Sequence, residues 1–311
     1  NMDIRFFDGH CDTAWRMFTQ GESLLENGGH WDLKRAGKYS GAKQVFALYA
    51  DDRYAGDFGR LYDGMLENFL REIGENSDAA VLCTTVREAD RAEKAGKTAA
   101  FLSIEGGELI DCDPDKLEKA RDSGVRMLNP VWNHDNLWCG SVNGSGSGLT
   151  AKGRDMVKKA QELGIILDVS HMSDRGFWDL CEQTDAPFIA SHSNSRAVWG
   201  AKRNLTDEQF LEIKRRGGTV GINLYRGFLG PDADIDTILR HIEHFIRLGG
   251  EDNISLGCDF DGCDELPAGI AGVQDIDKIY SAVLAAGYSR RVADKLFHDK
   301  STRPVDIICA T

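Results

Sequence analysis

The sequence predicts a parallel α/β barrel of the (β/α)8 class, the TIM barrel. The chain has 311 residues, which is long enough for one such barrel with ordinary loops. Short runs of apolar and β-branched residues alternate with longer segments of helical period, the pattern of βα units around a parallel sheet. Eight such runs occur, the number that closes this barrel. In chain order the expected strands are residues 4–8, 44–50, 99–104, 125–131, 165–169, 188–191, 219–224 and 254–257.

The segments between these runs carry helix signals. Asp113 and Pro114 predict a helix start before residues 116–121, and Thr206 predicts one before residues 207–214. An apolar stripe at helical spacing predicts a further helix and consists of Ile235, Ile238, Leu239, Ile242, Phe245 and Ile246. The glycines expected to end helices just before the next strand are Gly164, Gly217 and Gly249.

Nothing in the sequence marks a second domain. Residues 140–148 are rich in Gly and Ser and predict a flexible loop after the fourth run. We find no repeat, no Pro/Ser linker and no change of composition along the chain. We therefore expect residues 1–311 to form a single barrel that is also the catalytic domain.

The charge and the apolar stretches exclude two classes of partner. The 37 Lys and Arg residues against 50 Asp and Glu residues give a formal net charge of -13, which opposes the counterion release that drives nucleic-acid binding. The longest apolar stretches, such as residues 45–50 and 164–167, are far shorter than the roughly 18 residues of a membrane span. We expect neither nucleic acid nor a membrane as a partner.

The cysteines and the first residues favour a cytoplasmic location. Eight cysteines are scattered without a C-x-x-C pair in a chain too large to need disulfides for stability, so we expect reduced thiols. Residues 3–8 lack the basic and apolar regions of a secretory signal.

Polar residues gather where the expected strands end. In a barrel of this class the loops after the strands build the active face, so the carboxyl ends of the strands meet at one rim. Five of these ends carry residues of the kinds that bind metals. They are residues 8–12 (DGHCD), 103–107 (SIEGG), 168–171 (DVSH), 190–192 (ASH) and 258–262 (CDFDG).

This combination of residues indicates a metal centre for hydrolysis. Imidazole and carboxylate ligands together favour zinc or a similar divalent ion. His10 and Asp12 point to the same side of an extended segment, so one ion can bind both. A carboxylate such as Glu105 can bridge two metals about 3.5 to 4 Å apart, and such a pair activates a water molecule.

The remaining histidines are expected to lie outside the site. His241 and His244 lie off the apolar stripe and are expected at the surface. His30 and His298 follow no expected strand. Asp261 is expected to support a turn at the following glycine and not to bind metal.

Several motifs occur in an order that resembles the membrane (renal) dipeptidase family, peptidase family M19. They are DGHCDTAW at 8–15, SIEGG at 103–107, GLTAKGRDMV at 148–157, LGIILDVSHMSD at 163–174, PFIASHSNSRAV at 187–198, KRNLTDEQ at 202–209, GGTVGIN at 217–223 and GCDFDG at 257–262. The resemblance covers most of the chain. It implies a zinc peptidase with a metal-dependent amidohydrolase type of barrel.

The resemblance also implies roles for individual residues. His10 and Asp12 would bind one zinc ion, His171 and His192 the other, and Glu105 would bridge the two. Asp259, the first carboxylate of DFDG, resembles the acid/base residue that handles the proton of the attacking water and of the leaving amine. Arg203 resembles the residue that binds the free carboxylate of the substrate, a task that suits its planar guanidinium. An ordinary surface ion pair is the alternative for Arg203.

Two regions depart from the family pattern. The family often has a histidine that polarises the substrate just after the fourth strand, and here Trp132 occupies that position with His134 two residues later. Either the loop places His134 equivalently on the substrate, or the support for the oxyanion differs. The family usually closes with an apolar helix, whereas residues 297–304 have no regular pattern.

Together these features predict a cytoplasmic, bacterial-type dipeptidase with two Zn²⁺ per chain. A hydroxide bridging the metals would attack the scissile carbonyl of a small dipeptide, whose C-terminal residue the resemblance allows to be a D-residue. One alternative is another amidohydrolase that acts on N-acyl amino acids or lactams, and a second is a metal-binding homologue without catalysis. The sequence is compatible with a homodimer.

Overall fold

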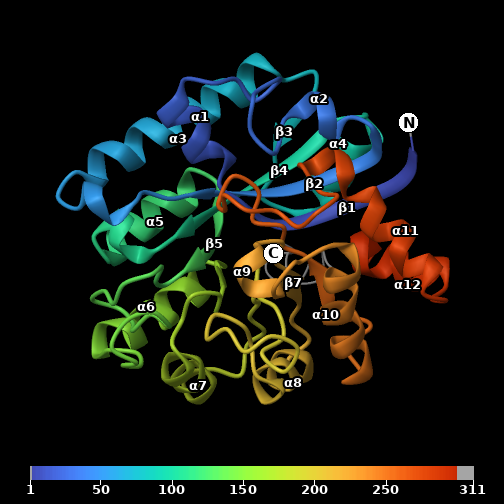
Figure 1. Ribbon diagram of the computed structural model, residues 1–311. Helices are drawn as coiled ribbons and strands as arrows, with labels where there is room; N and C mark the ends of the chain where they lie inside the picture. Colours follow the sequence, from blue (N-terminus) through green and yellow to red (C-terminus); the bar gives the residue numbers. More distant parts are fainter. Residues whose placement is uncertain (1, 300–311) are drawn as a thin grey trace.

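The strands of the protein form one parallel sheet that curls at the centre of the molecule, with the helices around it (Figure 1). The computed structural model describes residues 2–299. The strands are β1 (Met2–Cys11), β2 (Tyr39–Leu48), β3 (Ala80–Leu82), β4 (Thr98–Glu105), β5 (Val125–Asn129), β6 (Ile166–Leu167), β7 (Val220–Ile222) and β8 (Ile254–Leu256). Along the sheet their order is β6-β5-β4-β2-β1-β8-β7, and β3 pairs with β4 outside this path.

The segment between β6 and β7 completes the circuit of the barrel. Its Ile189 bridges to Asp168 after β6, and its Ala190 bridges to Val220 of β7, both in parallel. On the opposite side β1 pairs with β8 through Asp8 and Leu256. The predicted TIM barrel is therefore confirmed, although the sixth expected run, residues 188–191, forms isolated bridges in place of a regular strand.

Glycines allow this irregular segment to approach the strands beside it. The backbone carbonyl oxygen of Ser191 would lie only 2.0 Å from a Cβ atom placed on Gly221 and 1.9 Å from one placed on Gly257. No side chain fits at either position, because real Cβ contacts are not this short. The same close approach brings the residue after Ser191, which is His192, to the rim of the barrel.

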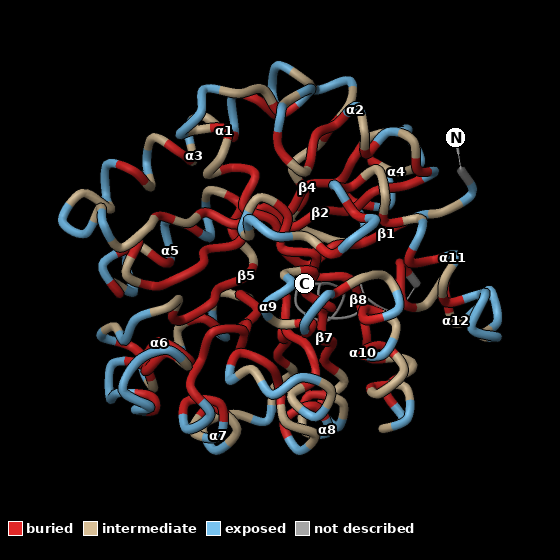
Figure 2. The backbone as a smooth tube through the Cα atoms, in the orientation of Figure 1, coloured by how far each residue is buried: buried red, intermediate tan, exposed pale blue. Residues whose placement is uncertain are grey.

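The helices lie on the outside and turn their apolar faces inward, so the buried chain is concentrated in the middle of the molecule (Figure 2). They are α1 (Thr13–Gln20), α2 (Leu33–Ala36), α3 (Phe58–Glu75), α4 (Val86–Lys94), α5 (Pro114–Asp122), α6 (Ala151–Glu162), α7 (Asp174–Gln183), α8 (Asp207–Arg215), α9 (Arg226–Leu229), α10 (Ile235–Arg247), α11 (Asp277–Ala285) and α12 (Arg290–Asp294). Among these helices, none is both long and apolar enough to cross a membrane.

The expected helix starts are confirmed. The Asp113 side chain accepts a hydrogen bond from the backbone N–H of Asp115 at the start of α5. Thr206 and Gln209 form a capping box at the start of α8. Each cap satisfies backbone donors that the first turn leaves unpaired, an effect of about 1 kcal/mol.

The sequence did not indicate the short strand β3. Its three residues pair with residues 98–100 of β4, whereas β5 pairs with the later part of β4. The end of the described chain is more ordered than its pattern predicts. Residues Lys295–Asp299 form a π-helical turn in which Leu296 and Phe297 are buried, and the rest of the irregular stretch, residues 300–304, lies outside the described residues. The seven cysteines within residues 2–299 are all free thiols, and Cys309 lies outside this range.

His241 contradicts the prediction of a surface position. Its side chain on α10 is completely buried. One ring nitrogen accepts the backbone N–H of Ser195 at 3.1 Å, and the other donates to the backbone carbonyl of Leu229 at 2.9 Å. The prediction was wrong because two irregular segments pack against this side of α10 and need a polar partner there. His244 is partly buried and pairs with Asp207 at 2.8 Å.

Burial of His241 predicts a loss of stability in acid. Burial, with the nearby charges of Arg240 and His244, lowers the pKa of His241 to about 4, whereas the unfolded residue titrates near about 6.5. Between these values the unfolded chain binds more protons than the folded chain, so stability falls as the pH falls. We expect the protonation of His241 to lower the free energy of unfolding by at most about 3 kcal/mol as the pH falls through that interval.

Urea unfolding of the wild type and of His241→Asn at pH 7.5 and at pH 4.5 measures this effect. The wild type should lose more unfolding free energy between the two values than the variant, because the amide does not titrate. Equal losses in the two proteins would contradict the assignment to His241.

Candidate metal centre

Ligand-type side chains converge on the carboxylate of Glu105, the last residue of β4. Its Oε2 atom lies 3.2 Å from Nε2 of His10, 3.1 Å from Nε2 of His171 and 3.2 Å from Nε2 of His192. These three histidines come from β1, from the loop after β6 and from the segment between β6 and β7. The barrel therefore brings together side chains that are up to 182 residues apart in the sequence, counting from His10 to His192.

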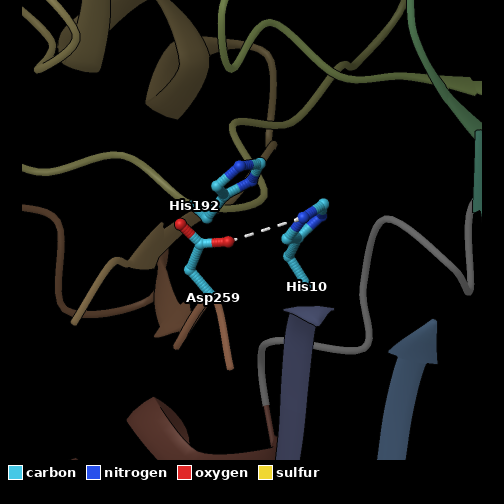
Figure 3. A group of neighbouring side chains, drawn as sticks. All are labelled: His10, His192 and Asp259. Atoms are coloured by element: carbon cyan, nitrogen blue, oxygen red, sulfur yellow. Dashed lines mark ion pairs between the residues drawn. The ribbon is translucent and has the colours of Figure 1, made fainter. Parts of the chain in front are cut away.

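Two further carboxylates complete the cluster. Asp12 Oδ2 lies 3.2 Å from His10 Nε2, as expected from their spacing along an extended segment. Asp259 Oδ1 lies 3.7 Å from the same nitrogen. Figure 3 shows the Asp259 carboxylate and the His192 ring beside His10 at the tip of β1. The rings of His10 and His192 are stacked, with their centres 3.7 Å apart.

These atoms form overlapping groups that could hold metal ions. Within residues 2–299, three groups have all their ligand atoms within 4.8 Å of one another. The groups are His10, Asp12 and Glu105; Glu105, His171 and His192; and His10, His192 and Asp259. Glu105 belongs to the first two groups, which is the position a bridging carboxylate would take.

The residues fit a pair of divalent cations in their chemistry as well as their positions. Imidazole nitrogens of His171 and His192 face each other at 3.2 Å, with a carboxylate oxygen beside them. Asp12 Oδ1 and His171 Nδ1 are buried polar atoms without a hydrogen-bond partner in the described structure. Such buried donor atoms are costly unless something satisfies them, and imidazole with carboxylate suits zinc.

The backbone is strained at two of these positions. His171 has a φ of +77° and Asp259 a φ of +61°, values that non-glycine residues rarely adopt. Strain of this kind costs on the order of 1 kcal/mol or more and tends to persist at functional sites. Gly262, three residues after Asp259, leaves room for the cluster, since a Cβ there would lie 2.1 Å from Asp12 Oδ2 and 2.2 Å from Asp259 Oδ1.

Buried carboxylates below the cluster hold its backbone in place. Asp8 accepts the backbone N–H of Cys258 at 2.8 Å and the side-chain amide of Gln44 at 2.7 Å. Asp168 accepts the backbone N–H groups of Ser170 and Ser191 at 3.1 and 2.9 Å. Each of these carboxylates therefore links the ends of neighbouring strands beneath the histidines. We assign neither of them as a metal ligand.

The charges in the cluster strongly perturb one another. Burial would lower the pKa of His10, but the carboxylates of Glu105 and Asp12 raise it well above its usual range. Burial, reinforced by the positive charges of His10 and Arg203, lowers the pKa of His192 well below its usual range. Burial raises the pKa of Asp259 to about 6. Groups whose pKa values are shifted in this way within one buried cluster are typical of a functional site.

Arg203 is buried, so the alternative of a surface ion pair is wrong. Its guanidinium donates to Ser193 Oγ at 2.7 Å and to the backbone carbonyl of His192 at 2.9 Å, while its Nε atom has no partner in the described structure. It lies over the ring of Phe228, with Cζ at 5.4 Å from the ring centre. Arg203 does not itself line the main cavity but lies behind two residues that do, Phe228 and His171.

The main cavity has a volume of about 400 Å³ and opens above the cluster. Its wall includes Asp12, Glu105, His171 and Asp259 together with the aromatic residues Trp15, Tyr49, Trp132, Tyr225 and Phe228. His134 is not part of this wall. Its side chain is 69% exposed and pairs with Asp52, so the structure does not place it toward the cluster.

Some residues that shape the site were not singled out in the sequence. Asn223, just after β7, donates to Asp259 Oδ2 and to the backbone carbonyl of His192, both at 3.3 Å. Ser193 lies between Arg203 and the hydroxyl of Ser170, 2.9 Å away. Their position one or two residues beyond a strand end was the only signal, since Asn and Ser are common in ordinary turns.

Comparison with known proteins agrees with the geometry. The family model for membrane dipeptidase (peptidase family M19) matches residues 2–306. An uncharacterised protein from the pqqA 5′ region of Klebsiella pneumoniae is 37% identical over 237 residues, which cover 72% of this chain and 87% of that protein.

Solved structures show the same similarity. A dipeptidase AC, a metallopeptidase of family M19, is 30% identical and superposes with a TM-score of 0.92, covering 100% of both chains. A metallopeptidase from Rhodobacter sphaeroides, liganded with a phosphinate mimic of the dipeptide L-Ala-D-Ala, is 28% identical with a TM-score of 0.89 and covers 99% of this chain and 100% of its own. The chain therefore belongs to the membrane dipeptidase family, peptidase family M19, and is a metal-dependent dipeptidase.

Proposed function

We propose that the protein is a binuclear zinc dipeptidase that accepts a D-residue at the C-terminal position of its substrate. The observation that carries this proposal is the position of Glu105 Oε2, within 3.1 to 3.2 Å of imidazole nitrogens from three histidines. A single carboxylate between two ligand groups fits two ions better than one. The phosphinate mimic of L-Ala-D-Ala bound to the Rhodobacter sphaeroides relative supports the substrate class.

We assign the residues of the cluster to two ions. His10 and Asp12 would hold one, His171 and His192 the other, and Glu105 would contact both. Bound zinc would supply an activated water nucleophile and stabilise the negative charge on the carbonyl oxygen during attack. The barrel fixes these ligands from different strand ends, so we infer that residues 1–311 act as one catalytic domain.

The surroundings of Asp259 support a role as the proton carrier. One of its carboxylate oxygens faces His10 at 3.7 Å, and the other accepts the side-chain amide of Asn223 at 3.3 Å. The pKa of about 6 allows this carboxyl to gain and lose a proton near neutral pH. We propose that it accepts a proton from the attacking water and passes it to the leaving amine.

Arg203 is the group proposed to recognise the free carboxylate of the dipeptide. It remains charged when buried, and Ser193 and the His192 carbonyl hold it in a fixed orientation. Its Nε donor has no hydrogen-bond partner within residues 2–299. A cation at a fixed distance from the metal ligands would favour substrates with a single residue after the scissile bond.

The metal content of the purified protein tests the bridging role of Glu105. We expect two divalent ions per chain at saturation, measured by elemental analysis. Glu105→Gln should hold at most one, because both groups lose a charged ligand. Glu108→Gln is the matched control, since that partly buried carboxylate accepts a hydrogen bond from Asn136 and belongs to none of the ligand groups found among residues 2–299. A saturating value of one ion in the wild type would rule out the bridge.

The Asp259→Asn variant tests the proton carrier. We expect kcat to fall by about 10²- to 10⁴-fold, the usual loss for a general acid or base, while the metal content stays at the wild-type value. Asp264→Asn, which removes an exposed carboxylate from the same cavity wall, should affect kcat much less. Loss of metal from Asp259→Asn would instead make this residue a ligand.

A substrate panel tests Arg203 and the dipeptidase specificity together. The wild type should cleave L,L and L,D dipeptides and should cleave tripeptides, dipeptide amides and N-acetyl amino acids poorly. Arg203→Ala should lower kcat/KM for dipeptides by about 2 to 4 kcal/mol of transition-state binding and abolish the preference over amides.

Rapid cleavage of amides by the wild type would exclude Arg203 as the carboxylate site. Rapid cleavage of N-acetyl amino acids or lactams with no cleavage of dipeptides would favour the broader amidohydrolase alternative. Bound zinc without turnover of any substrate would favour a homologue that binds metal without catalysis.

A further inference from the structure

Asp259, the residue proposed to carry the proton, begins a tight turn with an unusual backbone. Both Asp259 and Asp261 have a φ of +61°. The backbone N–H of Gly262 closes the turn on the carbonyl of Asp259 at 3.0 Å. Residues other than glycine seldom keep such φ values unless their surroundings hold them. The position of the Asp259 carboxylate therefore depends on the contacts that hold residues 259–262.

The first half of this turn is bonded to the end of β1. The backbone N–H of Asp259 donates to the carbonyl of His10 at 3.1 Å. The backbone N–H of Asp12 donates to the carbonyl of Phe260 at 2.8 Å. Both bonds join the turn to the strand end that carries His10 and Asp12.

The second half of the turn is held by His30, which lies in the segment between α1 and α2. His30 and Asp261 exchange two hydrogen bonds although they are 231 residues apart. The backbone N–H of Asp261 donates to Nδ1 of the His30 ring at 2.9 Å, and the backbone N–H of His30 donates to Asp261 Oδ1 at 2.8 Å. The hydroxyl of Thr13 donates to the other carboxylate oxygen of Asp261 at 2.7 Å. Asp261 is therefore held through its backbone as well as its side chain.

The segment around His30 is itself fixed in place. The backbone N–H of Val273 donates to the carbonyl of His30 at 2.9 Å, and the guanidinium of Arg35 donates to the carbonyl of Gly29 at 2.8 Å. A Cβ atom on Gly29 would lie 2.5 Å from Asp261 Oδ1, so this segment packs directly against the turn. His30 thus presents its ring to the turn from a well-supported position.

The His30 ring accepts the Asp261 N–H in its neutral form. Burial lowers the pKa of His30, and the carboxylate of Asp261 opposes this shift. A neutral imidazole has one acceptor nitrogen, which here is Nδ1, so its proton is on Nε2. His30 is not part of the cavity wall to which Asp259 and Asp261 belong. Its ring can therefore influence the reaction only through the turn.

We propose that His30 is a positioning residue, whose Nδ1 atom holds residues 259–262 in the conformation that directs the Asp259 carboxylate toward His10. Asp259 Oδ1 lies 3.7 Å from His10 Nε2 in this conformation. Without the acceptor, the N–H of Asp261 would lose its partner and the turn could relax from its strained φ values. The inference rests on the proposed function, because His30 acts through the proposed proton carrier.

Three substitutions of His30 separate the acceptor from the bulk of the ring. His30→Asn places an oxygen where Nδ1 lies, His30→Gln places it one bond further along, and His30→Leu has no acceptor. We expect the Leu and Gln variants to lower kcat for dipeptides by about 10- to 10²-fold, since a displacement of about 1 Å can cost that much. KM and metal content should stay near the wild-type values, and His30→Asn should keep most of the wild-type kcat.

His244→Leu is the matched control for these substitutions. The side chain of His244 is 19% exposed, against 24% for His30, and it pairs with Asp207 at 2.8 Å. This pair lies on α10 and at the start of α8, away from the turn. The His244→Leu variant should have the wild-type kcat.

A double variant tests whether His30 acts through Asp259. Changes that act through one group are not additive. Adding His30→Leu to Asp259→Asn should therefore leave kcat close to that of Asp259→Asn alone. Losses that multiply in the double variant would contradict the inference.

The outcomes distinguish this inference from the proposed function. If the wild type cleaves dipeptides and the Leu and Gln variants keep its kcat, His30 does not position the turn. An equal loss in the Asn and Gln variants would show that the acceptor at Nδ1 is not the cause, and this comparison stands even if His30→Leu does not fold. A wild-type kcat in Asp259→Asn, or a wild type that cleaves no dipeptide, would contradict both proposals.

Discussion

The structure depends on the burial of three imidazoles around the carboxylate of Glu105, together with the carboxylates of Asp12 and Asp259 beside them. Grouping so many polar side chains away from water is unfavourable unless each finds a partner. The barrel is organised to supply those partners. Asp8 and Asp168 bind the backbone beneath the histidines, Asn223 holds Asp259, and Arg203 holds the carbonyl of His192. Divalent cations would satisfy the ligand atoms that still face one another.

The fold and the convergence of these His, Asp and Glu side chains could be predicted from the sequence for the same physical reason. In a parallel barrel every strand delivers its carboxyl end to one rim, so residues that follow apolar runs meet without any knowledge of the loops. Glu105 ends β4, and His10 lies one residue before the end of β1. The irregular segment between β6 and β7 still brings His192 to the rim, because two parallel bridges fix its position.

The features that could not be predicted from the sequence depend on contacts between segments that lie far apart along the chain. His241 has the helical position of a surface residue, and only the packing of residues 195 and 229 against α10 makes it a buried hydrogen-bond partner. His134 and Trp132 are two residues apart in one loop. The hydrogen bonds of Ser141 and the pairing of His134 with Asp52 decide which of the two side chains reaches the cavity. Neither contact leaves a periodic pattern in the sequence.

The residues at the rim and the residues in the loops differ in what they determine. The rim residues determine the reaction, and the loop residues determine the choice of substrate. The side chains of the cluster lie on strands or on short turns that buried hydrogen bonds brace, and the backbone is strained at His171 and Asp259, so their geometry tolerates little change. Much of the aromatic part of the cavity wall instead comes from the segments after β2, β5 and β7, which contribute Tyr49, Trp132 and Tyr225. A substitution there would alter the surface that a substrate meets without disturbing the cluster around Glu105. Family membership therefore specifies peptide hydrolysis, while the aromatic and acidic wall of this chain would set which dipeptides enter.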